Sequence, residues 1–158
     1  MMKTLVVYYS RTGLTKKAAE ALAPLLEADL EEIREAHGRG GPLGWVRSGR
    51  EASQGLVVPI ESTRDPSSYG LVVIGTPIWA WTVSSPVRSY LNLMRDKLPQ
   101  VAFFCTLDGN VGKTFEIMAE LSGKKPIATA EILSSEVKGE DFLEKIKAFA
   151  DSIRRVST

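Results

Sequence analysis

The stretch Leu5-Val6-Val7-Tyr8-Tyr9-Ser10-Arg11-Thr12-Gly13-Leu14-Thr15 decides the fold, because it joins a strand, a turn and the start of a helix. Its first five residues are all apolar or aromatic, which is typical of a strand buried on both faces. Ser10 to Gly13 form the turn. After it, apolar residues recur at the spacing of an amphipathic helix, at Leu14, Ala18, Leu22 and Leu25. Pro24 is expected to kink or shorten this helix.

The same alternation continues to the end of the chain. The apolar pattern predicts further strands at 28–35, 71–74, 101–105 and 127–133. Residues 28–35 fit a helix period as well as a strand by pattern alone. Helices are expected at 43–54, 85–94, 114–121 and 142–153, with Ser85 as the capping hydroxyl before Pro86. Gly75-Thr76-Pro77 is expected to end the strand that begins at Leu71.

Strands that alternate with helices predict an α/β fold, in which a doubly wound parallel sheet has helices on both faces. The length of 158 residues predicts one domain spanning residues 1–158. Ligands bind such sheets beyond the carboxyl ends of the strands. The loops at 10–15, 76–82 and 106–110 are therefore the expected site.

Composition excludes several classes of function. The chain has 20 Lys and Arg against 19 Asp and Glu, and a net charge of +1 supplies no field that would attract nucleic acid. No apolar run approaches the roughly 20 residues that span a bilayer, and no signal peptide is evident, so a cytoplasmic location is expected. One cysteine and one histidine argue against an internal disulfide and a Cys/His metal site.

The loop after the first strand combines hydroxyls, a glycine and the amides of a helix N-terminus. These groups can hold a phosphate without a lysine or a metal, and Arg11 can add charge or point to solvent. An equally simple interpretation is that Ser10 or Thr12 only caps the helix and Gly13 serves the turn.

Two segments resemble the flavodoxin family. Residues Tyr8 to Thr15 are similar to its phosphate-binding loop, with the pattern hydroxyl-x-Thr-Gly-x-Thr matched at Ser10, Thr12, Gly13 and Thr15. Gly75-Thr76-Pro77-Ile78-Trp79-Ala80-Trp81-Thr82 and the helix after it resemble the second flavin-contacting loop. The resemblance implies a three-layer, five-stranded parallel sheet of order 2-1-3-4-5 with bound FMN. It is weakest over residues 36–69.

The resemblance implies cofactor contacts in three loops. In the first they are Ser10, Arg11, Thr12, Gly13, Leu14 and Thr15; in the second they are Thr76, Pro77, Ile78, Trp79, Ala80 and Trp81. Trp79 is the main candidate for contact with the flavin ring, and the alternative is that both tryptophans pack as peripheral core. Trp81 departs from the family pattern, because related proteins often have glycine at this position.

The third loop matches the family less closely. The resemblance places Thr106, Leu107, Asp108 and Gly109 at the pyrimidine side of the ring, although the family often has two small residues in place of Leu107-Asp108. A carboxylate near a reduced, anionic flavin would disfavour that state. The simpler expectation for Asp108 is an ordinary turn residue that faces outward.

The remaining motifs give little indication of function. Gly112-Lys113-Thr114 lacks the earlier glycine of a nucleotide-binding loop, because position 107 is leucine. Cys105 is expected to be a buried apolar residue, and His37 to be solvated. Phosphoacceptor receiver domains share the topology but need acidic residues where Tyr9-Ser10 and Gly75-Thr76 stand.

Three functions remain open from the sequence. The first is an FMN-binding protein that carries electrons between a reductase and a redox partner protein. The second is an FMN-dependent NAD(P)H oxidoreductase that acts on a quinone-like or other small electron acceptor, with residues 36–69 as a lid or contact and arginines at Arg39, Arg47, Arg50 and Arg64. The third is a non-catalytic interaction module. No catalytic acid, base or nucleophile is assigned.

Overall fold

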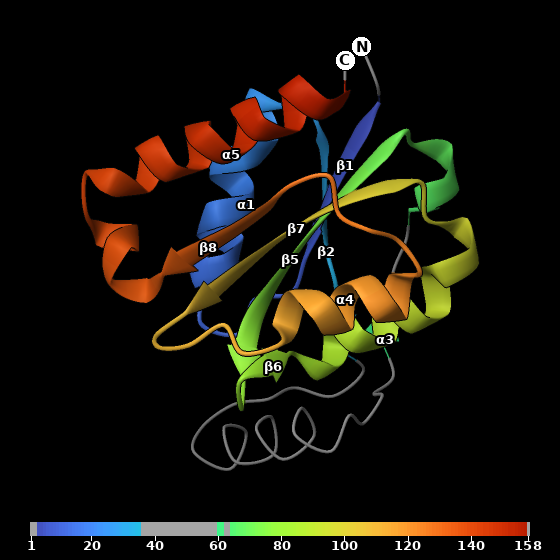
Figure 1. The fold of residues 1–158 in the computed structure, drawn as a ribbon, viewed down its shortest axis with the longest axis horizontal. Coiled ribbons are helices and arrows are strands. Elements are labelled where there is room, and N and C mark those ends of the chain that lie inside the picture. The colour runs from blue at the N-terminus through green and yellow to red at the C-terminus, as the bar shows by residue number, and fades with distance from the viewer. Residues whose placement is uncertain (1–2, 36–59, 62–63, 158) are drawn as a thin grey trace.

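The computed structural model describes residues 3–35, 60–61 and 64–157, and its centre is a parallel sheet of order β2-β1-β5-β7-β8 (Figure 1). The five strands are β1 (Thr4–Tyr8), β2 (Asp29–Glu32), β5 (Leu71–Trp79), β7 (Gln100–Leu107) and β8 (Thr129–Leu133). Every pairing along this path is parallel. The predicted α/β class and the order 2-1-3-4-5 are both confirmed.

Helices cover both faces of the sheet. On one face lie α1 (Leu14–Leu25) and α5 (Asp141–Ser157), and on the other lie α3 (Ser85–Met94) and α4 (Thr114–Ser122) (Figure 1). Each pair of helices closes its own apolar core against the sheet. The predicted buried stripe of α3 is correct at Val87, Tyr90 and Leu91, which are fully buried. Pro24 lies in the last turn of α1, and the helix ends one residue later at Leu25, so the hydrogen bond that its missing N–H removes is confined to the end of the helix.

The strand that begins at Leu71 does not end at Gly75-Thr76-Pro77, so that prediction is wrong. It continues to Trp79 and turns back into β6 (Thr82–Val83), which pairs with it antiparallel through Ile78 and Trp79. The extension follows from this pairing and from the register of Pro77 beside Thr106 of β7. β7 is likewise longer than predicted, so Thr106 and Leu107 belong to a strand and not to a loop.

The segment predicted as a strand at 28–35 is divided. Only β2 joins the main sheet, and β3 (Arg34–Glu35) pairs instead with β4 (Ile60–Glu61) in a separate two-stranded sheet. At the other edge, residues 127–128 do not belong to β8. The predicted helix at 43–54 and His37 lie outside the described residues.

Ser85 does not cap α3 as predicted, because it is the first helical residue. Ser84 holds the cap position without a side-chain bond to the helix, and its Oγ instead accepts a hydrogen bond from Thr76 Oγ1 at 2.9 Å. Ser84 N–H in turn donates to Thr76 Oγ1 at 3.1 Å. The serine therefore ties the helix to the end of β5.

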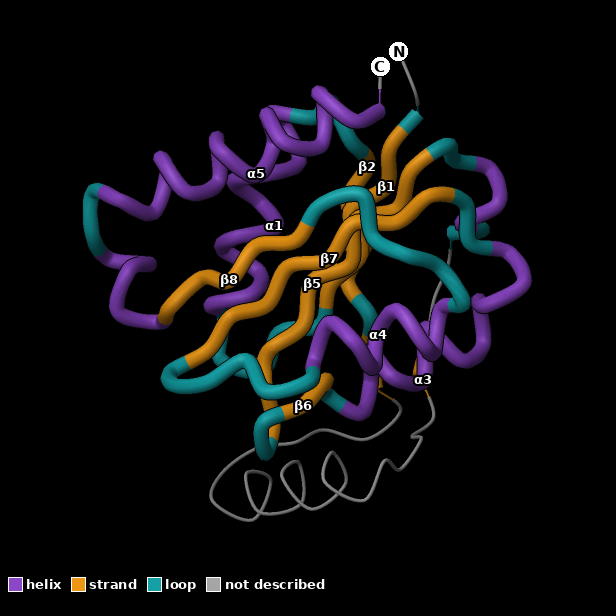
Figure 2. The backbone as a smooth tube through the Cα atoms, in the orientation of Figure 1, coloured by secondary structure: helices purple, strands orange, loops and turns teal. Residues whose placement is uncertain are grey.

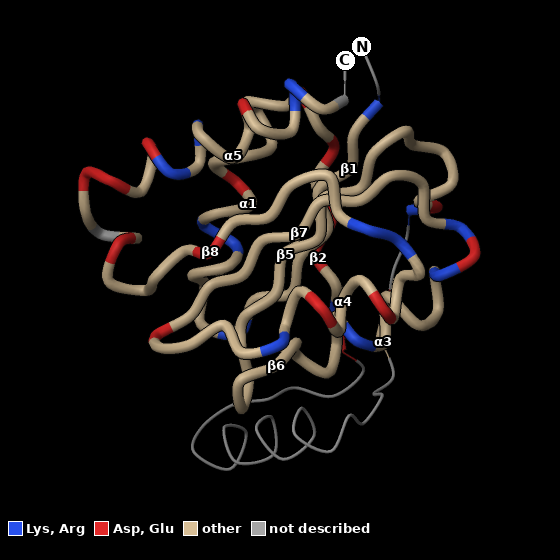
Figure 3. Tube along the Cα trace, viewed as in Figure 1, with Lys and Arg blue, Asp and Glu red and all other residues tan. Residues whose placement is uncertain are grey.

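Charged residues of both signs are scattered over the helices and loops, and the central strands β5 and β7 carry none (Figure 3). None of the helices in the described part of the chain is long and apolar enough to cross a membrane.

Candidate functional site

The carboxyl ends of β1, β5 and β7 lie at the same end of the sheet, so the segments that follow them meet there (Figure 2). A cleft of about 310 Å³ opens between these segments. We call it the three-loop cleft, and its lining consists of Arg11, Thr12, Leu14, Pro77, Ile78, Trp79, Thr106, Leu107, Asp108 and Ser134.

The cleft brings together residues from all three predicted segments. The remaining predicted residues adjoin it in sequence but are not part of its lining: Ser10, Gly13, Thr15, Thr76, Ala80, Trp81 and Gly109. Ser134 was missed by the sequence analysis. It follows the carboxyl end of β8, and its Oγ donates to the carbonyl of Leu107 at 3.2 Å. The rule that ligands bind beyond strand ends could have indicated it.

The first loop ends in an exposed helix N-terminus. Gly13 is the cap residue of α1, with a left-handed φ of 100°, and no side chain in the described part of the chain caps this helix. A Cβ added at Gly13 would meet nothing within 4 Å. Space is therefore open beside the cap residue, at the end of the helix that carries its partial positive charge.

The three hydroxyls of this loop are arranged differently from one another. Ser10 Oγ accepts a hydrogen bond from Gly13 N–H at 3.0 Å. This bond does not use the hydroxyl proton of Ser10. Thr12 is exposed and lines the cleft. Thr15 is 1% exposed, and its Oγ1 lies 2.7 Å from Oγ1 of Thr106 on β7.

Trp79 forms an apolar wall of the cleft and also belongs to the core. It is 2% exposed and packs edge-on against Tyr9, with ring centroids 5.5 Å apart and planes at 89°. This is a favourable arrangement for two aromatic rings. Trp79 therefore packs in the core, as one of the two interpretations from sequence expects, and it also lines the cleft; its contact with a flavin ring stays a prediction.

Trp81 is not a core residue, so that alternative is wrong. It stands at the tip of the β5–β6 hairpin with 71% of its surface exposed. Ala80 and Trp81 have φ of 51° and 61°, which are the left-handed conformations of a two-residue hairpin turn. Gly112 packs against this turn, since a Cβ there would lie 2.3 Å from the carbonyl oxygen of Trp81.

The third segment contributes both apolar and polar groups. Leu107 is 5% exposed and Asp108 is an exposed residue at the rim of the cleft. A Cβ added at Gly109 would meet nothing within 4 Å. Cys105 precedes this segment, is fully buried, and has its pKa raised to about 12 by burial. It therefore behaves as a buried apolar residue, as expected.

Arg64 lies away from this site. Its Nη1 donates to the Tyr69 hydroxyl at 3.2 Å and lies 3.6 Å from the Asp29 carboxylate. The backbone N–H of Arg64 donates to the Glu31 carboxylate. It thus fastens the edge strand β2, and it does not meet a ligand at the three-loop cleft. Arg39, Arg47 and Arg50 lie outside the described residues.

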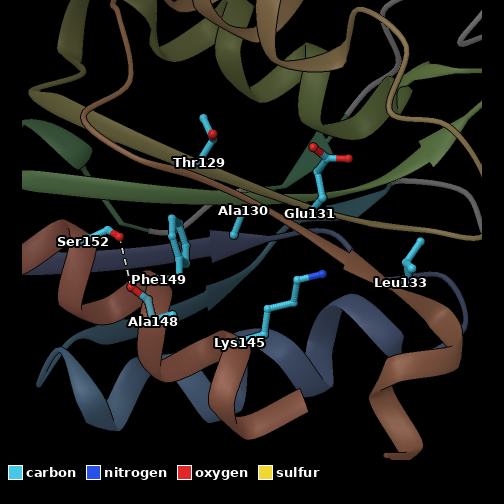
Figure 4. Close-up of a pocket in the computed structure, with 8 residues that line it drawn as sticks. All are labelled: Thr129, Ala130, Glu131, Leu133, Lys145, Ala148, Phe149 and Ser152. Atoms are coloured by element: carbon cyan, nitrogen blue, oxygen red, sulfur yellow. Dashed lines mark hydrogen bonds between the residues drawn. The ribbon is translucent and has the colours of Figure 1, made fainter. Parts of the chain in front are cut away.

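A second groove, of about 460 Å³, follows the free edge of β8 beside α5 (Figure 4). Lys145 within it donates to Glu136 at 2.8 Å, and Glu136 also accepts from the Leu133 N–H. These bonds fasten the end of β8 to α5. Its lining comes from β8 and α5 alone, so the groove contains none of the residues that follow β1 or β5 and no helix N-terminus.

Comparison with known proteins gives one family. Residues 3–120 match the sequence profile of the family described as flavodoxin. A flavoprotein from Lactobacillus acidophilus NCFM, solved in complex with FMN, is 28% identical with a TM-score of 0.73, and the match covers 87% of this chain and 97% of that one.

Two flavodoxins are more distant in sequence. An archaeal flavodoxin is 16% identical with a TM-score of 0.67, and the match covers 99% of this chain and 100% of that one. Oxidised flavodoxin 2 from Bacillus cereus is 15% identical with a TM-score of 0.62, and the match covers 97% of this chain and 98% of that one. These two similarities concern the fold alone. No protein of curated function matches the chain significantly. With its profile match over most of its length, the chain belongs to the flavodoxin family.

Proposed function

We propose that this protein holds FMN in the three-loop cleft and transfers electrons through it. The cofactor is FMN, since the chain belongs to the flavodoxin family and the similar protein from Lactobacillus acidophilus was solved with FMN. Bound FMN supplies the redox chemistry, and the protein supplies binding, orientation and shielding.

The residues of the first loop fit a phosphate group. Among the described residues no side chain caps the α1 N-terminus, its first turn contains no acidic residue, and the missing side chain of Gly13 leaves space beside it. A phosphate there would accept hydrogen bonds from the first-turn amides and from the hydroxyl of Thr12.

The other walls fit a flat ring. Pro77, Ile78, Trp79 and Leu107 are apolar and come from the ends of β5 and β7. A volume of about 310 Å³ is at the lower end of the usual size of small-molecule sites. These walls would exclude water from one part of the ring, while Asp108 at the rim stays in solvent.

The observation that carries the proposal is the N-terminus of α1, which no described side chain caps, at the three-loop cleft. Titration of the apoprotein with FMN, followed by flavin fluorescence and absorbance, tests it. Thr12→Ala is expected to weaken FMN binding about tenfold, the usual effect of losing one hydrogen bond to a charged group. Thr129→Ala, at an exposed threonine on β8, is the matched control. Wild-type protein that binds no FMN would reject the proposal and favour an interaction module.

Two redox roles are separated by a second measurement. A net charge of +1 gives little of the long-range attraction that steers a carrier to an oppositely charged partner protein, which favours a small electron acceptor. Under anaerobic conditions, direct bleaching of the flavin band by NADPH would support an NAD(P)H oxidoreductase. Bleaching only after a separate reductase is added would support an electron carrier.

A further inference from the structure

The hydroxyls of Thr15 and Thr106 form a buried hydrogen bond that joins two of the three segments around the cleft. Their Oγ1 atoms are 2.7 Å apart, the usual length of a good O–H···O bond. Thr15 lies in the first turn of α1 and is 1% exposed; Thr106 is near the end of β7 and is 4% exposed. The bond connects positions 91 residues apart.

The mutual hydrogen bond leaves one hydroxyl proton of this pair available. Each hydroxyl has one proton to donate and can accept as well, so the mutual bond uses one of the two protons. The other proton remains available to a third group. If Thr106 donates, the remaining proton belongs to Thr15, which is the second residue of a helix whose N-terminus lacks a side-chain cap. That proton then adds to the amides that would face a phosphate.

We propose that Thr106 is a positioning residue for the phosphate of FMN: its hydroxyl donates to Thr15 Oγ1 and so directs the proton of Thr15 to the phosphate. The inference rests on the proposed function. It differs from the expectation drawn from sequence, in which Thr106 acts at the pyrimidine side of the ring. It also gives a role to a threonine hydroxyl at a nearly buried position beside the first loop.

The test compares FMN with riboflavin, which has the same ring and no phosphate. Apoprotein is titrated with each flavin for the wild type, Thr106→Val, Thr106→Ser and Thr15→Val, with Thr129→Val as the control. Thr106→Val is expected to weaken FMN binding about tenfold and riboflavin binding less than twofold. Thr106→Ser keeps a hydroxyl and is expected to restore FMN affinity.

Two further readouts separate positioning from a merely structural role. The ³¹P resonance of bound FMN is expected to shift in Thr106→Val and to return in Thr106→Ser. In a double-mutant cycle, Thr15→Val with Thr106→Val is expected to weaken FMN binding little more than Thr15→Val alone, because Thr106 acts on the phosphate only through the hydroxyl of Thr15. The melting temperature of each apoprotein shows that the variants are folded.

Failure of this inference and failure of the proposed function give different results. Equal weakening of FMN and riboflavin in Thr106→Val would overturn the inference in favour of a ring contact and leave the proposed function in place. Additive effects in the cycle, or no ³¹P shift, would also overturn it. Wild-type protein that binds neither flavin would overturn the proposed function itself.

Discussion

The ring of Phe104 on β7 occupies the space that a side chain at Gly75 on β5 would need. The two residues are neighbours in the parallel register, and a Cβ built at Gly75 would lie 2.1 Å from Cζ of Phe104. Phe104 is 1% exposed and also packs against Phe149 of α5. The glycine therefore allows an aromatic side chain of one central strand to lie across its neighbour.

Gly75→Ala is expected to lower the free energy of unfolding by about 1–3 kcal/mol, the usual effect of overpacking a closed core. Urea denaturation of the apoprotein measures it. Gly109→Ala is the control, because a Cβ there meets nothing within 4 Å, and it is expected to change stability by less than about 0.5 kcal/mol. Equal stability of Gly75→Ala and wild type would show that Phe104 moves aside at little cost.

Trp81 has a backbone conformation that suits glycine, with φ of 61°. Trp81→Gly and Trp81→Ala both remove the exposed indole, but only glycine also removes the strain of the left-handed conformation. Trp81→Gly is therefore expected to be more stable than Trp81→Ala by about 1 kcal/mol. Thermal unfolding of the two variants gives the comparison, and a more stable alanine variant would contradict it.

Cys105 is expected to be unreactive in the native protein. Burial raises the pKa of its thiol from 9.0 to about 12, and the thiolate is the reactive form. At pH 8 a disulfide reagent should modify it only after denaturant is added. Because the folded-state pKa is the higher one, the stability from the neutral thiol is present below pH 9 and is lost as the pH rises toward 12. Rapid modification of native protein would show that the end of β7 opens readily.

Glu136 is expected to contribute to stability at neutral pH but not in acid. The hydrogen bond from Lys145 lowers its pKa below the ordinary 4.5, and the Leu133 N–H lowers it further. A lowered folded-state pKa means that this stability is present above about 4.5 and is lost as the pH falls through the folded-state value. Glu136→Gln should therefore be less stable than wild type at pH 7, with the difference shrinking toward pH 3. The exposed Glu140→Gln is the control, and a difference that does not change with pH would refute the assignment.

The parts of this fold that could be predicted from sequence are those in which local pattern reports burial. The apolar runs in β1, β5 and β7 are central strands because both of their faces are covered, and the spacing in α1 and α3 is that of helices with one buried side. The three segments that meet at the cleft follow from the parallel topology, since carboxyl ends of parallel strands share one end of the sheet.

Contacts between distant residues decided the rest. β2 has the polar sequence Asp29-Leu30-Glu31-Glu32, and it is a strand because its backbone pairs with β1. The Tyr8 hydroxyl of β1 also donates to Glu32 at 3.0 Å. The extension of β5 depends on its hairpin with β6, and the hydrogen-bond partner of the Thr15 hydroxyl is Thr106, 91 residues away. Sequence patterns record the period and burial of single elements. Hydrogen bonds and close contacts between elements exist only once the chain has brought their atoms within reach, so only the tertiary structure determines them.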